Sequence, residues 1–431
     1  MQKGLDLPSS AGRSPALRAG AAATLGAFLF AAAFGILAYR EEAGMLGPAA
    51  AVHTAVRPAA PAPRLSPAAL DSAEAEVRRE LERRAFPGAA LAVGIGGRTE
   101  RLAGMGRVGW RESAAPVSAD STLYDLASVT KPVATATAVL LLAQDGVIRL
   151  DDPVRRHLPQ FEGQFKDRVT WRHLLTHTSG LPAGAAIRGD APRERVRRIL
   201  RTRIDELPGR QVEYTDLGYV VLWEAAQRAA GEPLTGFLER RVWRPLGMTR
   251  TEFLPGQDCT ACAPTLRLST GEPYRGRPND LLARRLGGIT GNAGLFSTAH
   301  DLARFAAMLA NGGELDGVRI LAPETAREML RQQPGAGRRT LGFVAICPDE
   351  PHSEEKPCAK PLAVGHNGWT GTSLWIEPER RAWTVLLTNR SFDVRAKARM
   401  AELREESFRH AVVGAPADAV FPDPGTVRLA D

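Results

Sequence analysis

The apolar run Val133–Ala143 constrains the fold most, because it contains no charged residue and is apolar on every side. A helix that is hydrophobic all round is normally buried inside a protein. Pro132 stands directly before the run, and proline is tolerated only in the first turn of a helix. The helix is therefore expected to begin close to Ser128 and to run through the interior of the protein.

Ser128 and Lys131 lie three residues apart just before this run. On a helix this spacing puts both side chains on one face, and the hydroxyl lies at the positive end of the helix dipole, where a developing alkoxide is favoured. An amine in this position can help to take the hydroxyl proton. That role requires burial to lower the pKa of Lys131, because a solvated lysine is a poor base at neutral pH. Two fixed residues also arise by chance, so the pair gains meaning only from further motifs.

The start of the chain has the pattern of a membrane anchor. Residues 19–39 are 21 uncharged, mostly apolar residues, and a bilayer core needs about 20 residues of helix. Lys3, Arg13 and Arg18 precede the stretch, and positive charge tends to stay on the cytoplasmic side. Residues 1–18 are therefore expected in the cytoplasm, and the rest of the chain in the periplasm or outside the cell. A cleaved signal peptide is the alternative to a retained transmembrane signal anchor.

The remaining chain of this 431-residue protein divides by composition. Residues 40–70 are rich in Ala and Pro and predict an extended linker. Residues 71–415 carry regular periodicity and predict one folded domain, followed by a C-terminal tail at 416–431.

Hydrophobic patterns within this domain predict an α+β fold. Strands at both ends of the domain, with helices between them, indicate one sheet assembled from distant segments. The expected strands are 89–95, 98–103, 372–376 and 383–388; the expected helices are 71–84, one from about 128, a short one within 169–182, 219–230, one capped by Ser297-Thr298, and 395–411.

Four cysteines, Cys259, Cys262, Cys347 and Cys358, are present. Outside the cytoplasm disulfides are the expected state of cysteine. We prefer the pairing Cys347–Cys358, with Cys259–Cys262 as the weaker prediction. A zinc site is the alternative, but the second pair is spaced by ten residues where zinc motifs have two.

Arginines cluster between residues 193 and 203 on a predicted helix. Such a run usually forms a solvated face. Contact with anionic lipid or wall polymer is the alternative. Nucleic acid is not an expected partner behind a membrane anchor.

Two further motifs accompany Ser128-x-x-Lys131. Tyr214-Thr215-Asp216 follows 86 residues after Ser128, and His366-Asn367-Gly368 stands just before the last expected strand pair. Together they resemble the Ser-x-x-Lys, Tyr-x-Asn and Lys-Thr-Gly (or His-x-Gly) motifs of the serine β-lactamase and penicillin-binding-protein superfamily. The segments 174–182 and 291–298 are similar to its class C-like branch, which holds β-lactamases, D-Ala-D-Ala carboxypeptidases and esterases. The resemblance covers about residues 72–411.

The resemblance implies a β-lactamase/transpeptidase-like fold, an antiparallel sheet flanked by helices with an inserted, mostly helical subdomain. It also implies acyl transfer, with Ser128 as the nucleophile and Lys131 and Tyr214 sharing the proton transfers. Tyr214 would activate the deacylating water, since a neighbouring ammonium favours the phenolate. The backbone N–H groups of Ser128 and Trp369 would bind the oxyanion. His173 and His177 are expected to stabilise a loop.

The substrate side is expected to include Asp216, His366, Gly368 and Trp369, and two of these depart from the family pattern. Asp216 replaces an Asn, and an ionised carboxylate cannot donate a hydrogen bond to an acylamide carbonyl. His366 replaces a Lys and is expected to be only partly charged near pH 7. For His366 a structural role is as well supported as a substrate-facing one, and for the Trp369 side chain a role as pocket wall only is the alternative.

These observations predict a monomeric serine hydrolase of the cell envelope that uses neither metal nor organic cofactor. Its expected substrate is an ester or a peptide-like amide, with a peptidoglycan stem peptide as the leading case. A general carboxylesterase with the same residues is the first alternative. A wall-binding sensor that acylates without turnover is the second.

Overall fold

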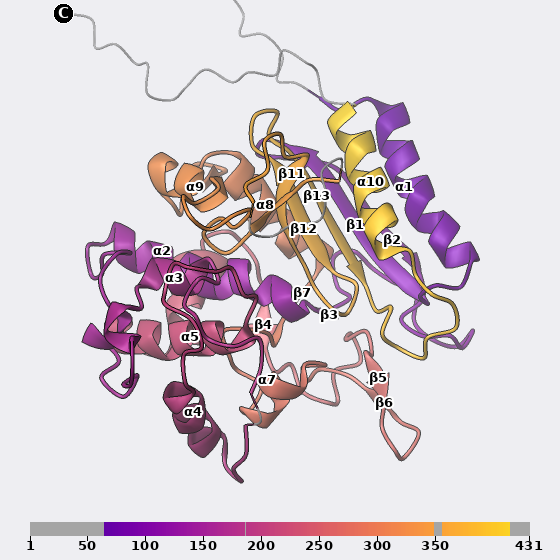
Figure 1. The fold of residues 1–431 in the computed structure, drawn as a ribbon. Helices are drawn as coiled ribbons and strands as arrows, with labels where there is room; N and C mark the ends of the chain where they lie inside the picture. Colours follow the sequence, from indigo (N-terminus) through magenta and orange to yellow (C-terminus); the bar gives the residue numbers. More distant parts are fainter. Residues whose placement is uncertain (1–63, 186, 349–355, 414–431) are drawn as a thin grey trace, which may run out of the picture. The chain divides into compact units, whose positions relative to one another are not determined.

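The computed structural model describes residues 64–185, 187–348 and 356–413 (Figure 1). The predicted anchor at 19–39 lies outside these residues, as do the cytoplasmic tail, most of the linker and the C-terminal tail. Among the residues that are described, no helix is both long and apolar enough to cross a membrane.

An antiparallel sheet of six strands organises the described residues, in the order β10-β11-β12-β13-β1-β2. Strand β1 pairs with β13 on one side and with β2 on the other. The prediction of one sheet built from both ends of the domain is therefore confirmed. The strands are β1 (Gly88–Ile95), β2 (Arg98–Gly106), β10 (Val344–Ile346), β11 (Ala363–Asn367), β12 (Ser373–Glu377) and β13 (Ala382–Thr388).

Helices cover both faces of this sheet (Figure 1). Helices α1 (Pro67–Glu82) and α10 (Met400–Val413) lie side by side against one face, and α8 (Ala299–Ala310) packs on the other. Side chains alternate between the faces of a strand, so Leu91 and Val93 of β1 join the core under α1 and α10, while Ala90 and Ala92 join the core under α8. Every residue of β1 is buried as a result.

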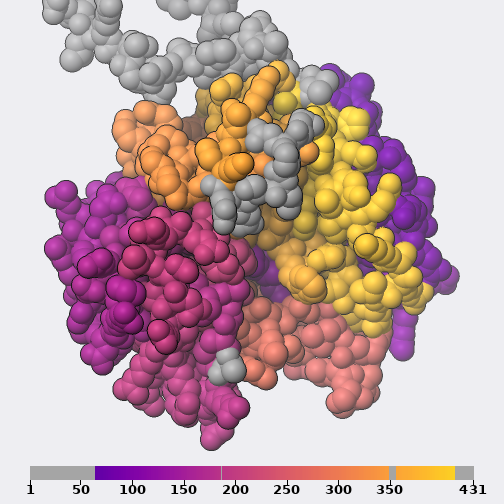
Figure 2. Space-filling view, in the orientation of Figure 1, coloured from indigo at the N-terminus to yellow at the C-terminus, as the bar shows by residue number. Residues whose placement is uncertain are grey.

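A largely helical region is inserted between β2 and β10. It includes α3 (Trp171–Leu175), α4 (Pro192–Arg201), α5 (Asp216–Ala230) and α6 (Leu234–Leu238). In Figure 2 this region, magenta, and the C-terminal strands and helix, yellow, occupy different parts of the visible face. Helix α4 buries Ile199 and Leu200 and exposes Arg193, Arg197 and Arg201, as predicted for a solvated basic face.

Smaller elements complete the inserted region. They are β3 (Tyr124–Asp125), η3 (Val154–Arg156), η4 (Lys166–Arg168), η5 (Glu239–Trp243), β4 (Glu252–Phe253), β5 (Leu266–Arg267), β6 (Pro273–Tyr274), α7 (Leu281–Arg285), β7 (Leu295–Ser297), β8 (Glu314–Leu315), β9 (Val318–Arg319) and α9 (Pro323–Leu330). The prediction that Gly180 and Pro182 close the helix within 169–182 is wrong. Helix α3 ends at Leu175, because the chain turns away at Thr176 to form a loop.

The helix that was predicted to start at Ser128 is built in three stages. A 3₁₀ turn, η1 (Ala127–Val129), is followed by a π-helical segment, η2 (Lys131–Ala136), and then by α2 (Thr137–Gln144). The Thr137 hydroxyl donates to the carbonyl of Pro132 at 2.8 Å, which satisfies an acceptor in the wider π turn. The segment 129–142 is buried throughout, as its composition predicts.

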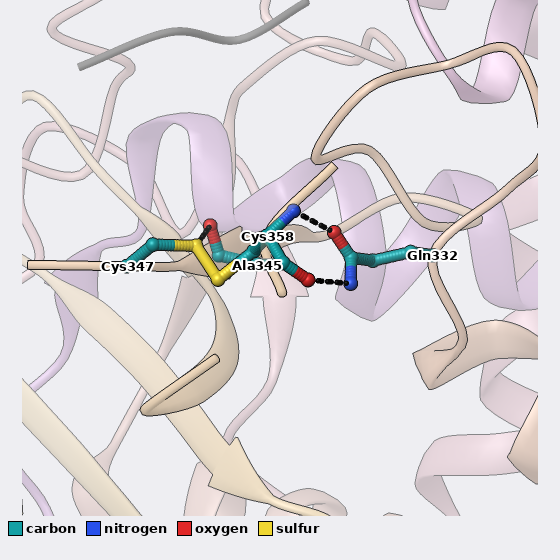
Figure 3. Close-up of a disulfide and its surroundings, with 4 residues drawn as sticks. All are labelled: Gln332, Ala345, Cys347 and Cys358. Carbon is teal, nitrogen blue, oxygen red and sulfur yellow. Dashed lines mark hydrogen bonds between the residues drawn. A yellow bond between two sulfur atoms is a disulfide. The ribbon is translucent and has the colours of Figure 1, made fainter. Parts of the chain in front are cut away.

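Both predicted disulfides, Cys259–Cys262 and Cys347–Cys358, are present. None of the four thiols is left to bind zinc, so the zinc alternative does not hold. Gln332 fixes the Cys358 end of the loop that the Cys347–Cys358 disulfide closes, as Figure 3 shows. Its amide nitrogen donates to the Cys358 carbonyl at 2.9 Å, and the Cys358 N–H donates to its amide oxygen at 2.7 Å.

Candidate functional site

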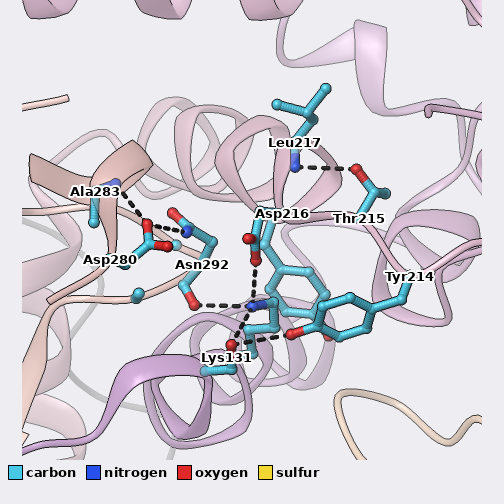
Figure 4. Close-up of polar contacts among 12 residues, drawn as sticks. Lys131, Tyr214, Thr215, Asp216, Leu217, Asp280, Ala283 and Asn292 are labelled. Carbon is cyan, nitrogen blue, oxygen red and sulfur yellow. Dashed lines mark hydrogen bonds and ion pairs between the residues drawn. The ribbon is translucent and has the colours of Figure 1, made fainter. Parts of the chain in front are cut away.

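Ser128 is half-buried in η1 and accepts two hydrogen bonds at its hydroxyl oxygen. The Lys131 ammonium donates to Oγ at 3.1 Å, and the Tyr214 hydroxyl donates to it at 3.0 Å (Figure 4). The fold thus brings together three residues from the first two sequence motifs. Such a hydroxyl between an amine and a phenol has the geometry of an activated nucleophile.

Lys131 is completely buried and has three acceptors around its ammonium. Besides Ser128 Oγ these are Asp216 Oδ1 at 2.7 Å and the Asn292 carbonyl at 3.0 Å (Figure 4). Burial by itself would lower the pKa of Lys131, but Asp216 and Tyr214 together outweigh burial and hold the pKa above its usual value. The requirement for a lowered lysine pKa is therefore not met. Spacing along the sequence did not predict this, because the charge partner Asp216 lies 85 residues away from Lys131 in the chain. Lys131 acts in this site as a cation.

The segment that carries Tyr214 is fixed by a buried histidine. The Thr215 N–H donates to His177 Nδ1 at 3.1 Å, and the Glu213 N–H donates to the His177 carbonyl at 2.9 Å. The His177 and Tyr214 ring centroids are 4.5 Å apart. Burial holds the pKa of His177 well below its usual value, so the ring stays neutral and accepts at Nδ1. His177 is thus a loop-stabilising residue, as predicted.

His173 also has a structural position. Its N–H and ring Nδ1 complete a capping box with Thr170 at the start of α3. This capping satisfies backbone groups that a helix leaves unpaired at its first turn.

The loop that follows the third motif is joined to the backbone just before Ser128 by two threonine hydroxyls. The Thr370 hydroxyl donates to the Asp125 carbonyl at 2.7 Å, and the Thr372 hydroxyl donates to the Leu126 carbonyl at 2.9 Å. A Cβ atom at Gly368 would lie 2.0 Å from Thr372 Oγ1 and 2.5 Å from the Leu126 oxygen. Glycine at 368 is therefore needed for this close approach.

His366 lies on β11, with its ring centroid 6.3 Å from that of Tyr214. Its Nδ1–H donates to the Asn367 carbonyl at 2.9 Å, and its buried Nε2 has no hydrogen-bond partner among the residues that the structure describes. Burial, together with the charges of Lys131 and Arg339, lowers the pKa of His366 to about 3. The expectation of partial charge near pH 7 is wrong, because the ring is out of water and beside two cations. A neutral His366 cannot replace the charge of a motif lysine.

Trp369 lies at the surface beside this motif, with 70% of its area exposed. The Arg390 guanidinium lies over its ring at 5.1 Å from the centroid. Asp216, by contrast, is engaged by Lys131 and is about one-third exposed. Of the four residues predicted to bind substrate, Trp369 is the most exposed.

Sequence reasoning missed three residues that build the site. Asp125 is buried and accepts from the N–H groups of Ala127 at 2.9 Å and Asn279 at 2.6 Å. Burial raises its pKa to about 6. It holds Ala127 at a φ of +48°, a strained conformation directly before the nucleophile. An acidic residue inside the apolar stretch 123–129 was a usable signal.

The other two missed residues come from distant segments. Asn292 supplies its backbone carbonyl to Lys131. Arg339 is 3% exposed and its guanidinium lies 5.2 Å from the Tyr214 ring centroid. Within the described residues, no cluster of three His, Cys, Asp or Glu side chains is placed to hold a metal ion.

Comparisons with known proteins agree with this geometry. A family model described as Beta-lactamase matches residues 73–407. A curated relative from Escherichia coli K12, named "Putative D-alanyl-D-alanine carboxypeptidase", is 30% identical over 315 residues, which cover 64% of this chain and 71% of the relative.

Solved structures share the fold. EstCE1, described as "a hydrolase with promiscuous acyltransferase activity", superposes with a TM-score of 0.63 at 21% identity, over 80% of this chain and 98% of its own. A "Beta-Lactamase/D-Alanine Carboxypeptidase" from Pseudomonas syringae gives 0.63 at 21% identity, over 80% and 99%.

Proposed function

Because the chain belongs to the Beta-lactamase family of hydrolases, we propose that it hydrolyses esters or peptide-like amides through an acyl-enzyme on Ser128. The observation that carries this proposal is the position of Ser128 Oγ, 3.1 Å from the Lys131 ammonium and 3.0 Å from the Tyr214 hydroxyl.

Tyr214 is the proposed base. To act as a base it would have to enter the reaction as the phenolate, with the Lys131 ammonium 5.0 Å from the centre of its ring; Lys131 remains a cation because Asp216 pairs with it. In acylation the proton of Ser128 passes to the Tyr214 oxygen while Oγ bonds to the carbonyl carbon; the proton then passes to the leaving group. In deacylation a water gives its proton to Tyr214 and attacks the acyl carbon, and Ser128 recovers a proton as its bond breaks.

The oxyanion is assigned to the backbone N–H groups of Ser128 and Trp369. Two threonine hydroxyls tie the loop around Trp369 to the strand before Ser128. These bonds support the assignment, because an oxyanion site works only when its donors are fixed before the charge develops.

For the natural substrate we propose a cell-wall peptide, cleaved in a carboxypeptidase-like reaction. Three things support this choice: the anchor-like pattern of residues 19–39, the presence of disulfides, which favour a location outside the cytoplasm, and relatives named as putative D-alanyl-D-alanine carboxypeptidases. On this proposal the catalytic domain lies in the periplasm or outside the cell.

A general carboxylesterase is the second candidate, and two observations favour it. The Asp216 carboxylate, bound to Lys131, cannot donate to a substrate amide. His366 is a neutral ring where a cation would attract a substrate carboxylate. Both features weaken recognition of a peptide and are indifferent to a simple ester.

The two candidates are separated by comparing kcat/KM for an acylated D-Ala-D-Ala peptide with that for a short-chain p-nitrophenyl ester. Release of D-Ala at a rate comparable to ester cleavage supports the wall-peptide substrate, and ester cleavage alone supports the esterase. The control is Ser128→Ala, which is expected to abolish both activities and leave the melting temperature unchanged. Hydrolysis that survives this substitution contradicts the whole proposal.

A further inference from the structure

Two guanidinium groups donate hydrogen bonds to carbonyl groups of the loop 368–372. Arg404 of α10 donates through Nη2 to the carbonyls of Gly368 at 3.2 Å and Thr372 at 2.9 Å. Arg390 donates through Nε to the carbonyl of Trp369 at 2.9 Å. Both ends of the loop and its second residue are therefore fixed by cations.

Neither cation has a carboxylate partner in the described part of the chain. Arg404 Nε is buried and has no hydrogen-bond partner within the described ranges. Burial, together with the charge of Arg390, lowers the pKa of Arg404 to about 9. Burying a charge without a counter-charge costs folding free energy, and such perturbed groups concentrate at functional sites. Stability of the fold therefore does not explain why Arg404 and Arg390 are placed beside this loop.

The geometry of the peptide unit supplies that explanation. The Gly368 carbonyl and the Trp369 N–H belong to one planar, trans peptide group, in which the two point in opposite directions. Arg404 binds the carbonyl end. The Trp369 N–H end has no hydrogen-bond partner among the described residues. A charged donor at the oxygen polarises the whole peptide and strengthens the N–H as a donor, because hydrogen bonds in a chain reinforce one another.

We propose that Arg404 is a positioning residue that strengthens the oxyanion site from behind, by polarising the Gly368–Trp369 peptide and adding an uncompensated positive charge. The inference rests on the proposed function, since it concerns the charge that develops when Ser128 attacks a carbonyl. Arg404 contacts neither the substrate nor the reacting atoms. Its effect is therefore expected on the transition state and not on substrate binding.

The experiment compares Arg404→Gln and Arg404→Lys with a control, Arg409→Gln, which removes an ion pair with Glu405 on the same helix. Each variant is assayed with p-nitrophenyl butyrate for kcat and KM, with phenylboronic acid as a tetrahedral transition-state analogue, and by thermal melting. For Arg404→Gln we expect kcat to fall roughly 10- to 100-fold, with KM within about twofold and weaker boronate binding in proportion to kcat.

Arg404→Lys keeps the charge and is expected to retain kcat within about fivefold of the parent. If Arg404→Gln does not fold, Arg404→Lys carries the test, and a folded lysine variant with a hundredfold loss overturns the inference. It is also overturned if Arg404→Gln loses no more kcat than Arg409→Gln, or if KM rises while boronate binding is unchanged. Activity that persists in Ser128→Ala would instead overturn the proposed function.

Discussion

Replacing Asp216 by Asn removes the counter-charge from Lys131 and leaves the rest of the site in place. Lys131 is completely buried, and its nearest acceptor is Asp216 Oδ1 at 2.7 Å. Breaking a buried ion pair by removing one partner costs about 3–5 kcal/mol. Because the Asp216 side chain is 32% exposed, solvent screening reduces this, and we expect Asp216→Asn to lower the free energy of unfolding by about 2 kcal/mol.

Asp145→Asn is the matched control. Asp145 is also 32% exposed and lies 2.7 Å from its arginine, but that arginine, Arg241, is itself 35% exposed. A surface pair of this kind is worth less than about 1 kcal/mol. Urea unfolding of both variants at pH 7 measures the difference. An Asp216→Asn variant that is no less stable than Asp145→Asn would refute the argument that this pair holds a buried charge.

The pH dependence of urea unfolding tests whether the charge of Lys131 causes this difference in stability. The pKa of Lys131 is raised in the folded protein, so the pair stabilises fully below the unfolded lysine value of about 10.4 and is lost only as pH rises through the folded value. In Asp216→Asn burial is left to lower the pKa of Lys131, so the variant gains stability as pH rises and the stability gap to the parent should narrow between pH 7 and 9. The substitution also supplies an amide that can donate to an acylamide carbonyl. We expect acylation by a penicillin to become about tenfold faster, as one added hydrogen bond allows.

Three further predictions follow from the site and its supports. Tyr214→Phe should lower kcat for ester hydrolysis by about 10²–10⁴-fold without changing the fold, because the proposed base is gone; a loss below tenfold would exclude that role. His366 is neutral in the folded protein, so its stabilising effect is present above pH 6.5. As pH falls from there to the folded pKa of His366, the free energy of unfolding drops by up to about 1.4 kcal/mol per pH unit. In urea unfolding between pH 6 and 4, His366→Gln should therefore lose stability less steeply than the parent, and equal slopes would contradict the lowered pKa. Replacing Cys347 and Cys358 by Ser should cost about 3 kcal/mol, the loop-closure value for an 11-residue separation; an unchanged melting temperature would show that the Gln332 contacts alone fix the loop.

Local patterns in the sequence predicted most of the sheet. The β1–β2 and β12–β13 pairs form where Gly and Pro punctuate apolar runs, and both are present. The buried nucleophile helix followed from Pro132 and the apolar run after it. Two-residue strands such as β3 leave no periodicity in a sequence, because tertiary contact alone defines them.

The chemical groups of the site were predicted better than their charge states. The order of the motifs predicted that Ser128, Lys131 and Tyr214 lie together, and the structure places them in contact. The pKa directions of Lys131 and His366 depend on which distant groups contact them, and spacing along the chain does not specify those contacts. Arg404 carries no sequence signal, since an arginine on a C-terminal helix normally faces water.

The most direct test of the central claim is the intact mass of the 70–431 fragment, followed over time after mixing with a penicillin or an activated ester. We predict a mass increase equal to the acyl group, located at Ser128 by peptide mapping, that appears and then decays as the acyl-enzyme hydrolyses. Ser128→Ala should show none. An adduct at another residue, or ester hydrolysis by Ser128→Ala at the rate of the parent, would contradict the assignment of Ser128 as the nucleophile.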